Sequence, residues 1–406
     1  MKKKVLDNGL TVLVDYQPGL HTAAISVAAR YGSNYDEDEK LGAAHLLEHM
    51  LNRGTSKRTG DQILDEIYNV GGDIYGSTKP DMTYYMVSVP AKKLDVGLDV
   101  VSDIFFNSKL SVSGIKHEKD VVQNEIRDYE SQLGEHIDAC LRNLLYSKHP
   151  IRRPPRGTSN TVGELTRKDI LDRYNKYFVP SNMVVGVVSN QEPDKVLAEI
   201  EKMFYTSRTG TSPIREPAVE RGQKANRTCS SWPGLKQTLL LLGVKTVEAR
   251  HPDGPALDVL KDILKKRLFK ELRDKRGLTY GSKADHKQGI DWGYFSCFSS
   301  TAPKNQTKVE RLMLEELNKL KKINKVELNM IKSQIRGTYE RSLDEAETII
   351  GRAMINEMVY DDLNYADKYI ERVQKLTVDD LEDVAKRYLN SKNVSVVAIT
   401  PPNSSS

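Results

Sequence analysis

The sequence predicts an α+β fold made of two similar domains, each with a sheet of the antiparallel type covered by helices. Three observations support this prediction. The chain has 406 residues, which is too long for one compact core and typical of two domains. A helix–strand pattern occurs twice, 211 positions apart, at Leu165 and Leu376. Each half begins with strands and then alternates helices with strands, which is typical of the α+β class.

The repeated pattern is an N-capped amphipathic helix followed by an apolar strand. The first copy begins at Leu165 and ends in the strand Met183–Val188. The second copy begins at Leu376 and ends in the strand Val394–Ile399. A period of half the chain indicates duplicated domains and not a solenoid, whose repeats are much shorter.

The domain boundaries follow from this duplication. We predict an N-terminal domain at 1–210 and a C-terminal domain at 225–400. The stretch 206–227 is polar and contains two prolines, so we expect it to be the linker. The tail 401–406 consists of prolines, asparagine and serines, and we expect it to be disordered.

Local patterns place the individual elements along the chain. Leu6–Val12 contains Asn8-Gly9 between alternating apolar residues, which predicts a β-hairpin with a type I′ turn. Gly42–Asn52 is predicted to form a short helix. Further helices are expected at Gly114–Ser131, Gly254–Lys265, Pro303–Leu320 and Lys325–Val359.

The most informative motif is His45-Leu-Leu-Glu48-His49, which lies in the first of these helices. Residues four apart share a helix face, so both imidazoles can bind one metal ion. Glu48 lies on nearly the same face, where its carboxylate can take a proton from a bound water. The order H-x-x-E-H is typical of zinc peptidases. A chance pair of histidines is the alternative, but with eight histidines in the chain such a match is rare.

A catalytic zinc ion usually has three protein ligands, so a third residue is needed. The helix Gly114–Ser131 carries Glu118 and Glu125, seven positions apart and therefore on one face. Exposed glutamates are common on helices, and periodicity alone does not choose between these two. The helix at Gly254–Lys265 corresponds to the metal helix but lacks the motif, so we expect one Zn²⁺ per chain.

A second group of candidate residues lies at Phe269–Gly281. Arg273 and Tyr280 offer a guanidinium and a phenol, and such donors stabilise the negative charge that develops during hydrolysis. The ordinary interpretation is a basic helix end with a glycine cap at Gly277, followed by a strand from Leu278. On the residues alone, the ordinary interpretation is the simpler one.

Composition argues against several other functions. The formal net charge is only +5 and basic residues alternate with acidic ones, so we expect no nucleic-acid binding. No apolar run approaches the roughly 20 residues needed to span a bilayer. Cys140, Cys229 and Cys297 are isolated and odd in number, which indicates a reducing compartment. The basic start at 1–4 lacks a following apolar core, so we expect a cytoplasmic protein.

These motifs resemble the pitrilysin, insulin-degrading enzyme and mitochondrial processing peptidase family of zinc peptidases. In that family a glutamate ligand follows the motif at the distance that separates His49 from Glu125 here, 76 positions. The resemblance implies that His45, His49 and Glu125 bind the metal and that Glu118 supports the site. It continues in the opening hairpin and at Gly71-Gly72, His149-Pro150 and Gly157-Thr158.

The resemblance also implies roles for residues that contact the substrate. Tyr280 would stabilise the oxyanion and Arg273 would hold the peptide. In the family the substrate adds as a strand to the sheet edge that follows the Gly-Gly turn, which here is the position of Tyr75, Gly76 and Ser77. The family has Asn and Ala where this chain has Tyr75 and Gly76, so the side-chain contacts are in question.

The predicted function is a zinc endopeptidase that hydrolyses peptides or unfolded segments, with Glu48 as general base. The family encloses peptides in a clam-shaped chamber of four such domains, of which this chain supplies half. We therefore expect a homodimer in which Arg273 and Tyr280 act in trans, or else a heterodimer with a homologous chain. The alternatives are a non-catalytic zinc-binding partner subunit and a different metal hydrolase with the same ligands.

Overall fold

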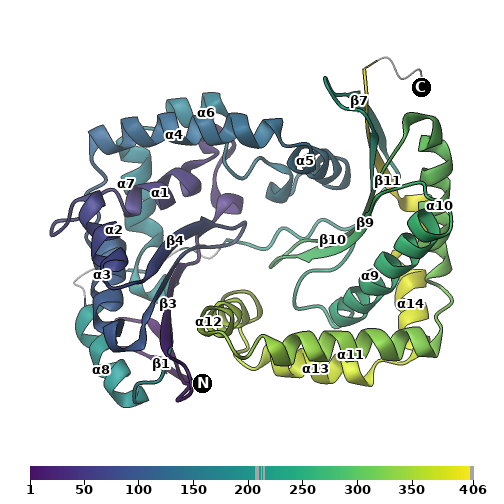
Figure 1. Cartoon of the computed structure of the whole chain (residues 1–406). Coiled ribbons are helices and arrows are strands. Elements are labelled where there is room, and N and C mark those ends of the chain that lie inside the picture. Colours follow the sequence, from purple (N-terminus) through teal and green to yellow (C-terminus); the bar gives the residue numbers. More distant parts are fainter. Residues whose placement is uncertain (206–209, 212, 214, 403–406) are drawn as a thin grey trace. The chain divides into compact units, whose positions relative to one another are not determined.

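The computed structural model describes residues 1–205, 210–211, 213 and 215–402, and it contains two compact units (Figure 1). Each unit has one sheet with helices packed on it, so the predicted α+β class with two similar domains is confirmed. Parts of the predicted linker and residues 403–406 of the predicted tail lie outside the described residues. The first unit comprises Met1–Asp128, Arg153–Glu216 and Glu340–Leu363, and the second comprises Tyr129–Arg152, Pro217–Tyr339 and Asn364–Ser406.

The first unit is built on a six-stranded sheet in the order β1-β2-β6-β3-β5-β4. Neighbouring strands are antiparallel except β2 and β6, which are parallel. Successive residues of β3 point to opposite faces, and both faces are buried, with Ile25 in one core and Ala24 in the other. The strands are β1 Lys2–Val5, β2 Thr11–Tyr16, β3 Thr22–Ala29, β4 Asp73–Thr78, β5 Thr83–Pro90 and β6 Met183–Ser189.

Seven helices contribute to the larger core of this unit, and α12 covers the opposite face of the sheet. The larger core contains both the metal-motif helix α1 and the helix α4. These helices are α1 Ala43–Leu51, α2 Gly60–Tyr68, α3 Leu94–Phe106, α4 Val112–Ser131, α6 Ser159–Glu164, α7 Arg167–Tyr177, α8 Pro193–Met203 and α12 Ala346–Ile355.

The second unit has a five-stranded sheet in the order β7-β11-β8-β10-β9, again with one parallel pair, β7 and β11. Five helices share one core with this sheet, and α5 covers its other face. The strands are β7 Arg227–Ser231, β8 Thr238–Lys245, β9 Ser282–Gln288, β10 Gly293–Thr301 and β11 Ser395–Thr400. The helices are α5 Leu133–Leu145, α9 Gly254–Leu268, α10 Gln306–Lys319, α11 Lys325–Arg341, α13 Tyr365–Lys375 and α14 Val378–Tyr388.

The sequence repeat forms equivalent elements in the two units. Its first copy is helix α7 followed by strand β6, and its second copy is helix α14 followed by strand β11. Thr166 and Thr377 both begin their helices with a capping box, in which the threonine hydroxyl accepts from the backbone of an aspartate three residues later. Both repeat strands lie between a parallel and an antiparallel neighbour, so the duplication extends to the topology.

The units exchange one helix each relative to the contiguous division at 1–210 and 225–400. Helix α5 comes from the first half of the sequence but packs on the second sheet, and α12 comes from the second half but packs on the first sheet. Each of these two helices packs closely against a glycine of the sheet that it covers. A Cβ on Gly186 would lie closer than 3.0 Å to Ile350 of α12, and a Cβ on Gly243 closer than 3.0 Å to Leu141 of α5.

Three local predictions need correction. The hairpin at Leu6–Val12 forms, but only Gly9 has a positive φ, +86°, so the loop is a turn closed by a left-handed glycine and not type I′. The segment Lys325–Val359 is helical but breaks between α11 and α12, where the chain passes to the other unit. The strand expected from Leu278 begins only at Ser282.

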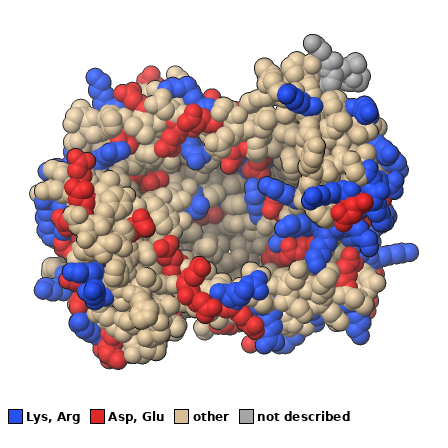
Figure 2. Space-filling model, viewed as in Figure 1, with Lys and Arg blue, Asp and Glu red and all other residues tan. Residues whose placement is uncertain are grey.

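Acidic and basic side chains both occur on the face of the molecule that Figure 2 draws. Figure 2 shows Lys and Arg side chains interspersed with Asp and Glu over the visible face. Among the described residues, no helix combines the length and the apolar character needed to cross a bilayer.

Candidate metal centre

Helix α1 positions the three residues of the motif, and its first turn is held by a buried aspartate. The Asp36 carboxylate accepts hydrogen bonds from the backbone N–H groups of Gly42 (3.0 Å) and Ala44 (3.2 Å) and from the Tyr31 hydroxyl (2.8 Å). Gly42 has a φ of +91°, which favours glycine. The apolar face of α1 is buried in the larger core, so the polar face with His45 and His49 is fixed in direction.

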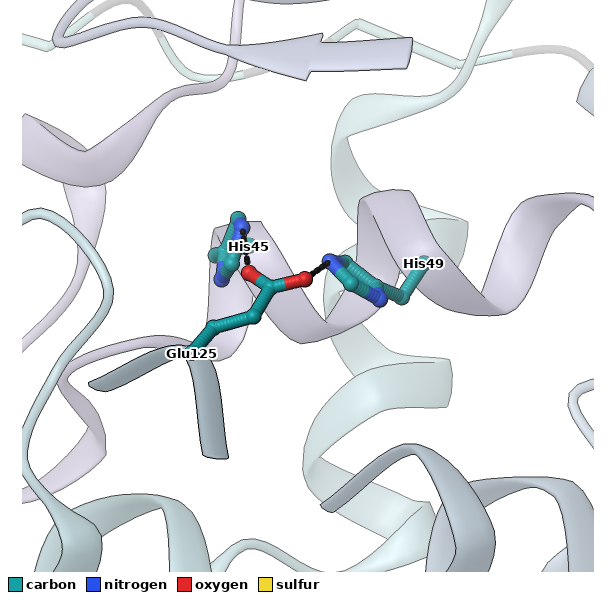
Figure 3. Close-up of side chains that lie close together, drawn as sticks. All are labelled: His45, His49 and Glu125. Carbon is teal, nitrogen blue, oxygen red and sulfur yellow. Dashed lines mark ion pairs between the residues drawn. The ribbon is translucent and has the colours of Figure 1, made fainter. Parts of the chain in front are cut away.

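His45, His49 and Glu125 come together (Figure 3). Glu125 Oε2 lies 3.5 Å from His45 Nε2, and Glu125 Oε1 lies 3.6 Å from His49 Nε2. One candidate ligand atom from each residue lies within 4.8 Å of the other two. Tetrahedral zinc ligands at about 2.0–2.1 Å from the ion are separated by about 3.3 Å, so these separations fit a shared ion. Among the described residues this is the one group of three or more such side chains that can share an ion.

The electrostatics of the cluster also fit a bound cation. Burial, with the charges of His49 and Arg156, lowers the pKa of His45 to about 3, so this imidazole is neutral and has a lone pair to donate. Burial lowers the pKa of His49, but the hydrogen bond that His49 donates to Glu118 and the charges of Glu48 and Glu125 outweigh burial and raise the pKa. The carboxylates therefore favour positive charge at this position, which a bound divalent ion would supply.

Glu118 contacts the back of the same histidine. Its Oε2 lies 2.9 Å from His49 Nδ1, and its Oε1 lies 2.6 Å from Arg53 Nε. The side chain of Glu118 is fully buried, and although burial raises its pKa, His49 and Arg53 lower it overall, so it is ionised. A carboxylate at Nδ1 holds the proton there and leaves Nε2 free to bind a metal. Periodicity did not distinguish Glu118 from Glu125, and the structure separates them: only Glu125 faces both Nε2 atoms.

Glu48 lies in the same pocket, beside strand β4. The Thr78 hydroxyl donates to Glu48 Oε2 (3.3 Å), and the Tyr85 hydroxyl donates to the Glu48 backbone carbonyl (2.7 Å). Burial raises the pKa of Glu48, although His49 and Thr78 act in the opposite direction. The pocket has a volume of about 280 Å³. Its lining consists of His45, Glu48, His49, Gly76, Ser77, Thr78, Glu125, Pro155 and Arg156.

The predicted substrate-binding residues Tyr75, Gly76 and Ser77 lie on β4, the last strand of its sheet. In the described part of the chain, β4 pairs only with β5, so its other edge is available to a peptide strand. Gly76 is next to Glu48, and a Cβ there would lie closer than 3.0 Å to Glu48 Oε1 and to the Tyr85 ring. A methyl group at position 76 would therefore require the end of the Glu48 side chain and the Tyr85 ring to shift.

Arg273 and Tyr280 lie in the second unit. Arg273 is in the π-helical turn η6, Phe269–Asp274, and its guanidinium lies over the Phe269 ring at 4.8 Å. Gly277 has a φ of +59°, and Leu278 N–H donates to Leu272 O (2.8 Å), which ends the helix as the predicted glycine cap does. Tyr280 follows in an irregular segment and is 82% exposed.

Sequence analysis missed several residues that shape this pocket. Asp36 and Arg53 lie close to the motif along the chain but belong to no recognisable pattern, and Arg156 is more than 100 positions from it. In the sequence Tyr85 is an ordinary aromatic residue of a strand, and only the structure shows that its hydroxyl donates to the Glu48 backbone carbonyl. Only Thr78 had a nearby signal, because it directly follows the predicted substrate-binding residues Tyr75, Gly76 and Ser77.

Two family models match the chain. The model described as Insulinase (Peptidase family M16) matches residues 11–159, and the model described as Peptidase M16 inactive domain matches residues 164–335. The first range contains the whole metal cluster, and the second contains Arg273 and Tyr280.

Relatives and solved structures cover nearly the whole chain. A Bacillus subtilis protein named as an uncharacterized zinc protease is 26% identical over 409 residues, covering 99% of this chain and 98% of its own. A similarly named protein of Mycobacterium leprae is 28% identical, covering 96% and 89%. The crystal structure of a protease from Helicobacter pylori matches with a TM-score of 0.91 at 25% identity, covering 98% of this chain and 99% of that one.

A Pseudomonas fluorescens structure described as a peptidase M16 inactive domain has the same TM-score of 0.91 at 20% identity, covering 98% of this chain and 97% of that one, and supports the fold alone. The two family models together span residues 11–335 except for a short gap, and the relatives align from end to end. This chain belongs to the M16 family of peptidases.

Proposed function

We propose that this protein is a zinc-dependent endopeptidase that hydrolyses peptides or unfolded segments. One observation carries the proposal: two imidazole nitrogens and a carboxylate oxygen lie within 4.8 Å of one another, and Glu48 lines the same pocket. Two His and one Glu are a ligand set of known zinc peptidases. The names of the relatives as zinc proteases support the same assignment.

The chain's own residues supply the proton transfers. Zn²⁺, when bound, lowers the pKa of a water molecule to about 7 and polarises the scissile carbonyl. Glu48 takes a proton from the attacking water while the water oxygen bonds to the carbonyl carbon. It then gives that proton to the amine nitrogen as the C–N bond breaks. Thr78 orients the Glu48 carboxylate, and the Tyr85 hydroxyl fixes the backbone that carries it.

The free edge of β4 supports a peptide that binds as an added strand. Backbone hydrogen bonds to this edge bind any sequence, so they suit an enzyme that accepts many peptides. Tyr75 is 45% exposed, so its side chain is available to contact the residues of the substrate.

Arg273 and Tyr280 form the second part of the proposal. The exposed Tyr280 hydroxyl is available to stabilise an oxyanion, and we assign this role to Tyr280 of a second copy of the chain in a homodimer. The test mixes a Glu48→Gln chain with a Tyr280→Phe chain. Recovery of activity in the mixed dimers is expected, and no recovery overturns the trans assignment.

The first experiment measures hydrolysis of an internally quenched, unstructured peptide by the parent protein and by Glu48→Gln. A loss of about 100- to 10,000-fold with zinc still bound is expected for removal of a general base. Glu130→Gln, an exposed glutamate on α4, is the matched control and should be fully active. Bound zinc without hydrolysis by the parent would instead support a non-catalytic partner subunit.

A further inference from the structure

Strand β4 presents different side chains to the two faces of its sheet. Gly76 and Thr78 lie on the face of the metal helix, where Thr78 donates to Glu48. Because successive residues of a strand point to opposite faces, Tyr75 and Ser77 lie on the other face. The proposed proton transfers use only the first face, so the second face is available to select the substrate.

Helix α12 packs on this second face (Figure 1). Tyr75 is paired across the strands with Met86, and residues directly opposite each other share a face. Met86 belongs to the same core as Ile350 of α12. A Cβ on Gly351 would lie 3.9 Å from Met86 Cε, so this side of the helix meets the sheet next to β4.

One carboxylate of α12 lies near the same edge of the sheet. Glu347 is one helical turn before Gly351, and residues four apart share a helix face. Partial burial raises the pKa of Tyr75, and the charge of Glu347 raises it further. The carboxylate of Glu347 is therefore close enough to act on the Tyr75 phenol, and the two side chains border the edge of β4 together.

The Glu347 carboxylate has no partner of its own in the part of the chain that the structure describes. The residue is half-buried, and neither an ion pair nor a side-chain hydrogen bond holds its carboxylate. Glu357, which follows in the turn after α12, differs in this respect, because it pairs with Lys3 at 2.6 Å. The charge of Glu347 is thus available to a ligand.

A second acidic group on the same face adds to this charge. Asp73 lies on β4 two residues before Tyr75 and therefore points to the same side of the sheet. It is exposed, and no described residue forms an ion pair with it. The α12 side of the β4 edge therefore combines an aromatic ring with negative charge.

A peptide that adds to β4 as a strand places its own side chains alternately on the same two faces. The residue opposite Gly76 faces the metal helix, and the residues before and after it face α12. A side chain next to Tyr75 then meets the aromatic ring and the unpaired carboxylates. Lys and Arg fit these groups, because their cations bind carboxylates and also lie favourably over an aromatic ring.

We propose that Glu347 and Tyr75 bind a Lys or Arg side chain of the substrate on the α12 face of β4. This inference rests on the proposed peptidase function and names its substrate class, peptides with a basic residue near the scissile bond. Because only every second residue of the added strand faces α12, the preference applies to alternate positions of the peptide. Glu347 and Tyr75 are thus specificity-determining residues.

The test measures binding without turnover. Zinc-loaded Glu48→Gln protein is titrated with fluorescent peptides in which Lys is compared with acetyl-lysine at each position in turn. We expect the charged form to bind about 3- to 10-fold more tightly at alternate positions, less than for a buried charged hydrogen bond because the site is partly exposed. No preference at any position, or no binding of any peptide, overturns the proposal.

The preference must depend on the charge of Glu347. In Glu48→Gln/Glu347→Gln the charged and acetylated peptides should bind nearly equally. In Glu48→Gln/Glu347→Lys the preference should reverse, so that the acetylated form binds more tightly. Glu48→Gln/Tyr75→Leu keeps the carboxylate and removes the ring, so the preference should fall by about 2-fold. A preference for Lys that is unchanged in the Glu347→Gln protein overturns the proposal.

A matched control separates this role from that of a charge at a helix terminus, where acids are stabilising. Asp61 is an exposed acid in the first turn of α2, as Glu347 is an acid in the first turn of α12. Glu48→Gln/Asp61→Asn should keep the full preference. If Glu347 only stabilises its helix, Glu347→Gln will lower the free energy of unfolding in urea and weaken both peptide forms equally, which contradicts the proposal.

The proposed function is tested independently of this preference. None of these binding measurements requires hydrolysis, so a failure of the peptidase assignment would be detected separately, by the quenched-peptide assay. A protein that hydrolyses the quenched peptide but shows no Glu347-dependent preference would retain the peptidase assignment and lose this inference.

Discussion

The same helix–strand junction occurs in both units, but its polar side chains face a pocket in the first unit and are buried in the second. In the first unit, α1 and the edge strand β4 border a pocket into which two histidines and two glutamates face. In the second, α9 and the edge strand β9 bury a single histidine, His286. Its Nδ1 lies 2.9 Å from Asp258 of α9, its Nε2 lies 3.1 Å from the Thr246 hydroxyl, and Tyr369 donates to the same aspartate.

The two junctions differ in whether the imidazole nitrogens have partners within the protein, and this difference distinguishes the candidate active site. Both nitrogens of His286 are satisfied within the protein, so nothing is left for a ligand. In α1, Glu118 satisfies only one nitrogen of His49, and the other faces the pocket. Counting from the first glycine of each helix, Leu257 and Leu260 of α9 occupy the positions of His45 and Glu48, and both are buried in the core.

The strongest test makes α1 resemble α9 at one position. His45→Leu should abolish zinc binding and lower peptide hydrolysis by at least about 1,000-fold, because the metal contributes several kcal/mol of charge stabilisation. The metal-free protein should be no less stable in urea, because His45 Nδ1 is buried without a hydrogen-bond partner. Metal content and hydrolysis are the measurements, and stoichiometric zinc in the variant would break the comparison.

A smaller change tests the strand that faces the helix. Gly76→Ala places a methyl group against the Glu48 carboxylate and should lower kcat/KM by about 10-fold or less, because this carboxylate is the end of a flexible side chain that can shift. Zinc content should be unchanged. Gly19→Ala is the control, since a Cβ at Gly19 meets nothing within 4 Å. Normal kcat/KM in Gly76→Ala would mean that the carboxylate has room elsewhere.

The support behind His49 can be weakened without removing a ligand. Glu118→Gln should reduce zinc affinity by about 10- to 100-fold, because the amide holds the His49 Nδ1 proton less strongly. Activity should return at saturating zinc. A chelator competition titration measures the effect, and Asp120→Asn, an exposed site on α4, serves as the control. An unchanged affinity would show that burial alone holds the ring of His49.

The smallest effect is expected from the second unit. His286→Asn removes the partner of Asp258 and should lower the free energy of unfolding by about 1–3 kcal/mol, the cost of an unsatisfied buried group. Zinc content and hydrolysis should stay at the level of the parent protein. Urea denaturation followed by circular dichroism measures the change. Loss of zinc in this variant would contradict a purely structural role for the cluster.

The sequence predicted those features that depend on local spacing. The helix of His45 and His49, the helix of Glu118 and Glu125, and the duplicated helix and strand after Leu165 are all present. Periodicity places side chains on a face of their own helix but does not say what that face meets. For this reason the roles of Glu118 and Glu125 stayed open on the residues alone, and the family resemblance had to distinguish them.

Features that depend on close approach in space were not predictable. Asp36 and Arg156 reach the metal helix through contacts that no helix or strand period predicts, and the Glu48 carboxylate beside Gly76 is 28 positions away in the sequence. The prediction of a type I′ turn at Asn8-Gly9 was wrong, because Asn8 keeps a negative φ. Its side chain instead accepts a hydrogen bond from Leu10 N–H. The sheet on which α12 packs was equally unpredictable, because an apolar helix face can pack on either sheet.

The exchange of α5 and α12 has a consequence for the order in which the chain is made. The apolar face of the first sheet that carries Leu13 and Val184 is covered by α12 and its following turn, which end at Tyr360. The ribosome synthesises α12 and this turn only after most of the second half of the chain. The second sheet waits for β11, which lies between β7 and β8 and ends at Thr400. The first unit is therefore complete only after Leu363 and the second only after Thr400, so a nascent or truncated chain exposes aggregation-prone apolar surface that chaperones must shield.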